Sequence, residues 1–162
     1  LPRIGEPDGS NAATSAVDFE TSSDFSSSWR GDLAIDGTIT DSSKWTSDGS
    51  APPHWLAIDL GEEKNVTGYI VNMSNETGEL REYSFIDFEI QTGPSLSGPW
   101  TTTKDVSNPT QYSVVRLYED PLIQSRFVRI LVNDPGVDNY ARLPEFEVYT
   151  GAETGAESWF LY

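Results

Sequence analysis

The densest group of candidate metal ligands lies in the short polar segment between Leu33 and Trp45. Asp36-Gly37 is a strong turn signal, and hard oxygen donors surround it at Thr38, Thr40, Asp41, Ser42 and Ser43. Glu145, far along the chain, would complete a cage of about six or seven oxygens if a β-sandwich brings the two regions together. Calcium accepts that ligand number, whereas magnesium requires a stricter octahedron. An Asx-type turn in a solvated loop also fits these residues, so both interpretations stay open here.

The paired carboxylates of a glycoside hydrolase are a second chemistry to consider in so acidic a chain. Such pairs lie about 5 to 9 Å apart across a cleft, and Glu76, Glu79 and Glu82 share one predicted loop. Loop glutamates are expected by chance among 26 acidic residues. The sequence has no Gly-x-Ser-x-Gly elbow or phosphate-binding loop. With one histidine and no cysteine, it offers few bases or nucleophiles, and we expect no enzyme activity.

The charge balance argues against several classes of ligand. Ten basic and 26 acidic residues give a formal net charge of −16, whereas nucleic-acid binding needs a cationic face. The same charge disfavours anionic lipid surfaces and heavily sulfated polysaccharides, and no apolar run reaches membrane-spanning length. A neutral or weakly charged ligand, or a bound cation, suits this surface better. Aromatic residues make up 12% of the chain, and we expect some of them to act in recognition.

Short strands separated by turns must position these candidates. Alternating apolar residues are clearest at 55–60 and 84–91, and a charged turn at 62–65 follows the first of these strands. No segment shows sustained helical periodicity with caps, so we predict an all-β sandwich or barrel. We expect one domain over residues 1–162, with its core at about 30–151. Further strands are predicted at 66–73, 100–103, 112–118, 126–132 and 145–150, with one or two short edge strands before residue 33.

Five short motifs in order resemble the discoidin, or coagulation-factor C-type, domain superfamily. The closest likeness is to its family 32 carbohydrate-binding modules. The match covers roughly residues 30–151 and implies an eight-stranded jelly-roll β-sandwich of the galactose-binding-domain-like type. The motifs are Ala34-Ile35-Asp36-Gly37 with Trp45, Trp55 to Gly61, Asp87 to Gln91 with Ser97-Gly98-Pro99-Trp100, Ser125 to Ile130, and Leu143 to Tyr149.

The resemblance also implies a structural Ca²⁺ at the oxygen-rich loop, and with it we favour calcium over a simple turn. The chain carries about two more residues between Asp36 and Trp45 than the family pattern, so Ser43 and Asp41 compete for one ligand position. The implied ligands are the carbonyls of Leu33, Thr38 and Pro144 and the side chains of Asp36, Ser43 and Glu145.

Glycan recognition in such folds uses loops at one end of the sandwich, where aromatic rings stack on sugar faces. Tyr140 matches the aromatic that family members place before the closing glutamate, and Arg142 flanks it. Asn75 and Glu82 stand where galactose-binding members carry other polar residues, so the galactose-type triad is absent and the sugar cannot be inferred. Trp29 and Arg30 form a further candidate pair, although Trp29 could instead be a core residue.

We therefore expect a non-catalytic carbohydrate-binding module that tethers a polysaccharide-active enzyme to its glycan. It would be a monomer within a larger extracellular or cell-surface protein, expected to be bacterial. The alternative is a protein-interaction or adhesion module on the same sandwich. Four apolar residues, Trp159 to Tyr162, at the end of the segment 151–162 favour a final strand there rather than a linker.

Overall fold

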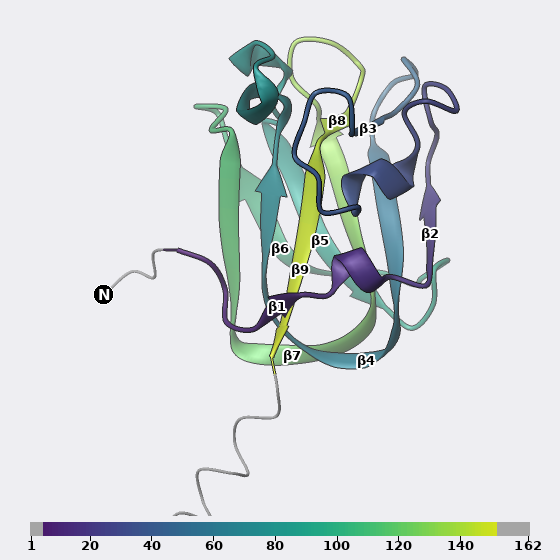
Figure 1. Ribbon diagram of the computed structural model, residues 1–162, viewed down its shortest axis with the longest axis vertical. Helices are drawn as coiled ribbons and strands as arrows, with labels where there is room; N and C mark the ends of the chain where they lie inside the picture. Colours follow the sequence, from purple (N-terminus) through teal and green to yellow (C-terminus); the bar gives the residue numbers. More distant parts are fainter. Residues whose placement is uncertain (1–4, 152–162) are drawn as a thin grey trace, which may run out of the picture.

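The computed structural model describes residues 5–151, and the strand expected at 151–162 lies outside this range except for Gly151. The described chain is all-β, with two packed antiparallel layers (Figure 1). Its helices are short 3₁₀ turns, and none of them could cross a membrane. The elements are β1 (Ser10–Asn11), η1 (Ala13–Ser15), β2 (Asp18–Thr21), η2 (Gly31–Ala34), β3 (Trp45–Thr46), β4 (His54–Asn72), η3 (Ser74–Thr77), η4 (Arg81–Tyr83), β5 (Asp87–Gly93), β6 (Thr101–Ser107), β7 (Val114–Asp134), β8 (Arg142–Leu143) and β9 (Glu145–Gly151).

β4 and β7 are long strands that bend, so that each one contributes to both layers. The first half of β4 pairs with β2 and with the second half of β7, which continues to β5 and β6. The second half of β4 pairs with β9 and with the first half of β7. With these halves counted separately, β2, β4, β5, β6, β7 and β9 make the eight-stranded sandwich that the resemblance implied.

The turn predicted at 62–65 is therefore a corner within one continuous strand. A register shift between Asp59 and Lys64 marks the bend, and Gly61 adopts φ 89° there, a conformation that favours glycine. The predicted strands at 55–60 and 66–73 are both correct in position, but they are joined. The predicted strands at 112–118 and 126–132 are joined in the same way within β7.

Apolar side chains from both layers fill the space between the sheets. Leu56, Ile58 and Leu60 are buried, as their alternation predicted. The strand predicted at 84–91 begins only at Asp87, as β5. Just before it, Phe85 is fully buried while Ile86 is only half-buried, so the predicted alternation fails there. The Phe85 ring packs edge-on to Phe88, with 6.1 Å between their centroids.

One end of the sandwich gathers most of the loops, and we call it the apical end. β4 begins and ends there, because its bend lies at the opposite end (Figure 1). Buried His54, at the start of β4, lies with Nε2 2.7 Å from the Asn139 carbonyl oxygen. β3 and β8 form a small separate sheet at this end. The segments 22–50, 73–84 and 135–143 meet at this end (Figure 1).

Candidate functional site

A hollow of about 370 Å³ lies among the apical loops. Two of the loops contribute its aromatic walls, and the small β3–β8 sheet contributes polar groups. Volumes of this order are typical of small-ligand sites. The lining residues are Phe25, Trp29, Lys44, Thr46, Tyr140 and Arg142. We refer to this place as the apical hollow.

Backbone hydrogen bonds attach the first aromatic loop to β3. The Phe25 amide donates to the Thr46 carbonyl at 2.7 Å, and the Thr46 amide donates to the Trp29 carbonyl at 3.1 Å. Phe25 is 55% exposed, and Trp29 is half-buried. Trp29 is thus a wall of the hollow and not a fully buried core tryptophan. That role belongs to Trp45, whose indole Nε1 donates to the Ser23 carbonyl at 2.9 Å.

Tyr140 forms an adjoining part of the wall. Its ring lies edge-on to Phe25, with 5.7 Å between centroids and 70° between planes. The Tyr140 amide donates to an Asp138 carboxylate oxygen at 3.0 Å, which fixes the backbone of this loop. Gly49 lies directly against the ring, since an added Cβ there would be 2.7 Å from the Tyr140 hydroxyl.

Arg142 is held in place by a carboxylate and by aromatic rings. Its two terminal nitrogens donate to the two Asp138 oxygens at 2.8 and 2.9 Å, and these bonds lower the pKa of Asp138. The guanidinium carbon lies 4.3 Å from the ring centroid of Tyr83 and 5.4 Å from that of Tyr140. This geometry leaves the Arg142 side chain little freedom.

Lys44 is the second cation of the hollow, and it is only 6% exposed. Its ammonium pairs with Asp41 at 2.6 Å and with Glu79, and it lies 5.2 Å from the Trp29 ring centroid. The bond from Lys44 lowers the pKa of Asp41. Glu79 also approaches Arg142, with 3.9 Å between Oε2 and Nε. The two cations are therefore compensated by the nearby carboxylates of Asp41, Glu79 and Asp138, and the hollow carries no excess positive charge.

The structure brings together three of the six predicted recognition residues, namely Tyr140, Trp29 and Arg142. Arg30 does not line the hollow and pairs instead with Asp32 at 2.8 Å. Asn75 lies in η3 and Glu82 in η4, both outside the lining. Glu79, between Asn75 and Glu82, is also outside the lining but pairs with Lys44, which does line the hollow.

The sequence interpretation missed Phe25, Lys44 and Thr46. Phe25 had one usable signal, because a large aromatic stands there in a run of serines. Thr46 had a signal in the family resemblance, because such modules often carry a histidine directly after the tryptophan that corresponds to Trp45. Nothing in the spacing of Lys44 showed that it lines the hollow. Their contribution depends on the pairing of β3 with β8, in which Thr46 lies opposite Arg142.

Glu145 is the main indication that a cation belongs at the predicted metal site. It is 1% exposed, and neither carboxylate oxygen has a hydrogen-bond partner among the described residues. Burial, with a smaller contribution from the negative charge of Asp36, raises the pKa of Glu145 to about 9. An uncompensated buried carboxylate is costly, and the charge effect places the Asp36 and Glu145 carboxylates close to each other.

The remaining donors fit a calcium ion held by hard oxygens. The Ser43 hydroxyl donates to Asp36, whereas the competing Asp41 is taken by Lys44. The Thr38 amide donates to Asp36 at 2.8 Å, so the Asx-type turn is also present. Residues 5–151 contain no cluster of three or more His, Cys, Asp or Glu side chains suited to a metal. A cation here would therefore need backbone carbonyls as well, and Leu33, Thr38 and Pro144 are the candidates.

Comparison with known proteins gives one family and a consistent set of folds. The F5/8 type C domain model matches residues 18–146, and no curated protein sequence matches the chain. Three solved structures illustrate the likeness, and at these identities it is chiefly a likeness of fold. The family 32 carbohydrate-binding module of Clostridium perfringens NanJ, in complex with galactose, has a TM-score of 0.72 and 19% identity, covering 86% of this chain and 98% of that one.

The other two come from one chitosanase/glucanase of Paenibacillus sp. IK-5. Its chitosan-binding module 1 has a TM-score of 0.72 and 21% identity, covering 86% of this chain and 98% of that one. Its chitosan-binding module 2, in complex with chitotriose, has a TM-score of 0.69 and 25% identity, covering 86% and 99%. The described sandwich thus spans almost the whole of each of these modules.

Proposed function

The chain belongs to the F5/8 type C domain family, and we propose that it is a non-catalytic module that binds a neutral glycan at the apical hollow. The observation that carries this proposal is the arrangement of the hollow itself. Phe25, Trp29 and Tyr140 form aromatic walls around two cations whose charges are already compensated. Apolar sugar faces stack on such rings, and a few fixed polar groups orient the hydroxyls.

The charges near the hollow favour a neutral sugar over an acidic one. Arg142 and Lys44 offer N–H groups to hydroxyl oxygens, but Glu79 and Asp138 would repel a carboxylate or sulfate on the ligand. The net charge of −16 adds to that repulsion. The solved modules that bind galactose and chitotriose are consistent with a glycan ligand.

The biological role that we propose is tethering. A weak sugar site on one module raises the effective concentration of an attached enzyme at its substrate. The module would then act outside the cell as a monomeric part of a larger bacterial protein. The likeness to a chitosan-binding module derived from a chitosanase/glucanase supports this role.

We also propose a structural Ca²⁺ bound by Asp36, Ser43 and Glu145 through their side chains and by Leu33, Thr38 and Pro144 through their carbonyls. The buried, unpartnered carboxylate of Glu145 supports it. The ion would neutralise Glu145 and Asp36 and connect the loop before β3 to the start of β9. Because it binds only the folded chain, it would raise the free energy of unfolding.

Affinity electrophoresis in gels containing neutral or acidic polysaccharides tests the function. We expect retardation on at least one neutral polysaccharide, and loss of it in Tyr140→Ala and Trp29→Ala. Tyr112→Ala is the matched control, because Tyr112 is 63% exposed and does not line the hollow. Retardation on no polysaccharide, together with a protein partner lost on the same two substitutions, would indicate a protein-interaction or adhesion module instead.

A further inference from the structure

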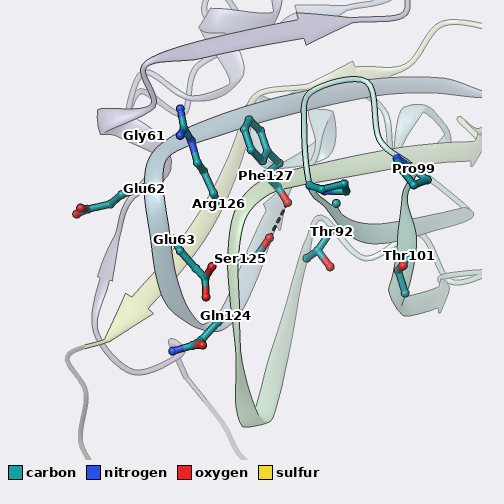
Figure 2. Close-up of a pocket in the computed structure, with 12 residues that line it drawn as sticks. Gly61, Glu62, Glu63, Thr92, Pro99, Thr101, Gln124, Ser125, Arg126 and Phe127 are labelled. Atoms are coloured by element: carbon teal, nitrogen blue, oxygen red, sulfur yellow. Dashed lines mark hydrogen bonds between the residues drawn. The ribbon is translucent and has the colours of Figure 1, made fainter.

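A second hollow lies at the end of the sandwich opposite to the apical one. Its volume of about 860 Å³ exceeds that of the apical hollow. It lies where β4 and β7 bend between the layers (Figure 2), and we call it the bend hollow. The first half of β4 runs from His54 to the bend, so the two hollows are separated by roughly 20 Å at about 3.3 Å per residue. Its lining residues are Gly61, Glu62, Glu63, Thr92, Gly93, Pro94, Pro99, Thr101, Gln124, Ser125, Arg126 and Phe127.

The loop that connects β5 to β6 gives the bend hollow a defined wall. The Gly98 amide donates to the Ser95 carbonyl at 3.0 Å, and the Ser95 hydroxyl donates to the Gly98 carbonyl at 2.8 Å. At Gly93 an added Cβ would lie 2.7 Å from the Pro99 carbonyl oxygen. The absence of a side chain at Gly93 therefore lets the loop fold back against the end of β5.

Arg126 gives the hollow a rigid rim without giving it a free positive charge. Its guanidinium donates to both oxygens of buried Asp59, at 2.8 and 3.0 Å, and lies 5.0 Å from the Phe127 ring centroid. Glu62 and Glu63 are exposed beside it. Anionic ligands such as phosphate esters or acidic sugars are therefore disfavoured.

The remaining surface combines flat apolar faces with free polar groups. Phe127, Pro94 and Pro99 supply the apolar faces. The side chains of Glu63, Thr92 and Thr101 have no hydrogen-bond partner among residues 5–151, so they are free to bind hydroxyl groups, whereas the Ser125 hydroxyl is taken by the Phe127 carbonyl at 2.8 Å (Figure 2). None of the strongly exposed large apolar residues lines the bend hollow, although Val17 lies beside it against Gly61.

We propose that the bend hollow is a second glycan-binding site, which takes a short neutral oligosaccharide. Rings flanked by hydroxyl-binding groups are suited to sugars, and the volume is large enough for more than one sugar unit. Two sites at opposite ends would let one module bridge two glycan chains or bind one polymer with raised avidity. The observations behind this proposal all concern residues of the bend hollow, so the proposal does not depend on glycan binding at the apical hollow.

Amide chemical-shift mapping of the full chain by NMR tests the proposal. The probes are cellotriose, xylotriose, mannotriose and laminaritriose, with trigalacturonic acid as the charged comparison. We expect at least one neutral trisaccharide to shift the amides of Gly61, Gly93, Ser125 and Phe127, and the acidic one to leave them unchanged. Thr101→Arg should raise the Kd at this site at least tenfold. Ser107→Arg, at the far end of the same strand and outside the lining, should not.

The outcomes separate this proposal from the proposed apical function. Shifts at the bend amides without shifts at Tyr140 or Arg142 would support the second site alone. Shifts confined to the apical amides across all four neutral probes would overturn it and leave the apical function intact. Bend amides that shift on removal of residues 152–162, with no response to any sugar, would also overturn it, because the occupant would then be the chain's own C-terminal segment.

Discussion

The Tyr140 ring lies against the backbone of Gly49, and a Cβ at that glycine would be 2.7 Å from the tyrosine hydroxyl. The apical wall is therefore positioned by the absence of a side chain 91 residues earlier in the sequence. Gly49→Ala should displace the ring and weaken binding of a retarding neutral glycan about tenfold, or roughly 1.4 kcal/mol. Isothermal titration calorimetry measures this change. Ser27→Ala, in an exposed part of the facing loop, is the control, and equal affinity of both variants would contradict the prediction.

Glu79 compensates the charge of Lys44 and approaches Arg142, so its neutralisation should change ligand choice. In Glu79→Gln we expect weaker exclusion of acidic sugars, seen as new retardation on a polygalacturonate gel. Binding to the neutral glycan should also fall, because the ammonium and guanidinium lose a common partner. Glu76→Gln removes an equal charge from an exposed position in η3 and should leave both properties unchanged. The same pattern in both variants would show that overall charge, and not the hollow, decides selectivity.

Calcium should be visible as a chelator-sensitive melting temperature. With Ca²⁺ at about 100 times its Kd, the ion adds about 2.7 kcal/mol, so EDTA should lower Tm by about 5 to 10 °C in a chain of this size. An unchanged melt, with no ion released from the purified protein, would mean that the Leu33–Trp45 segment is only a turn.

Glu145→Gln tests whether the carboxylate of Glu145 binds the calcium ion. The substitution replaces a buried carboxyl group, whose pKa of about 9 reflects the cost of charging it in the interior, by a neutral amide, so in EDTA the variant should melt at or above the parent chain. Added Ca²⁺ should no longer raise its Tm. Glu147→Gln, two residues along β9, should keep the calcium response. A calcium response that survives in Glu145→Gln would place the ion elsewhere.

The ion pair between Asp59 and Arg126 should make stability depend on pH in the acid range. Hydrogen bonds from Arg126 lower the pKa of Asp59 below its ordinary value of 3.8. The stabilisation is therefore complete above about pH 4 and is lost as the pH falls through the folded-state pKa. Urea unfolding at a series of pH values should show a shallower acid decline in Asp59→Asn than in the parent. Asp105→Asn, an exposed position on β6, should keep the parent slope.

Local patterns in the sequence were sufficient to predict the sandwich fold and much of its buried core. The alternation of Leu56, Ile58 and Leu60 placed them on a buried face, and the structure buries all three. The prediction failed at the corners, where the 62–65 segment stays within β4. A bend that preserves strand pairing has no pattern distinct from a charged turn, because both expose polar residues to water.

The sequence by itself determined an acidic, all-β chain, the oxygen-rich loop and three of the residues around the apical hollow. Only the tertiary structure decided which of them meet, because the hollow is assembled from Phe25, Lys44 and Tyr140, which lie far apart in the chain. It also placed Glu145 in the interior with no hydrogen-bond partner among residues 5–151, and it created the bend hollow at the corner of β4 and β7. Strand formation follows from short-range alternation, whereas these sites depend on long-range pairing, which no local spacing specifies.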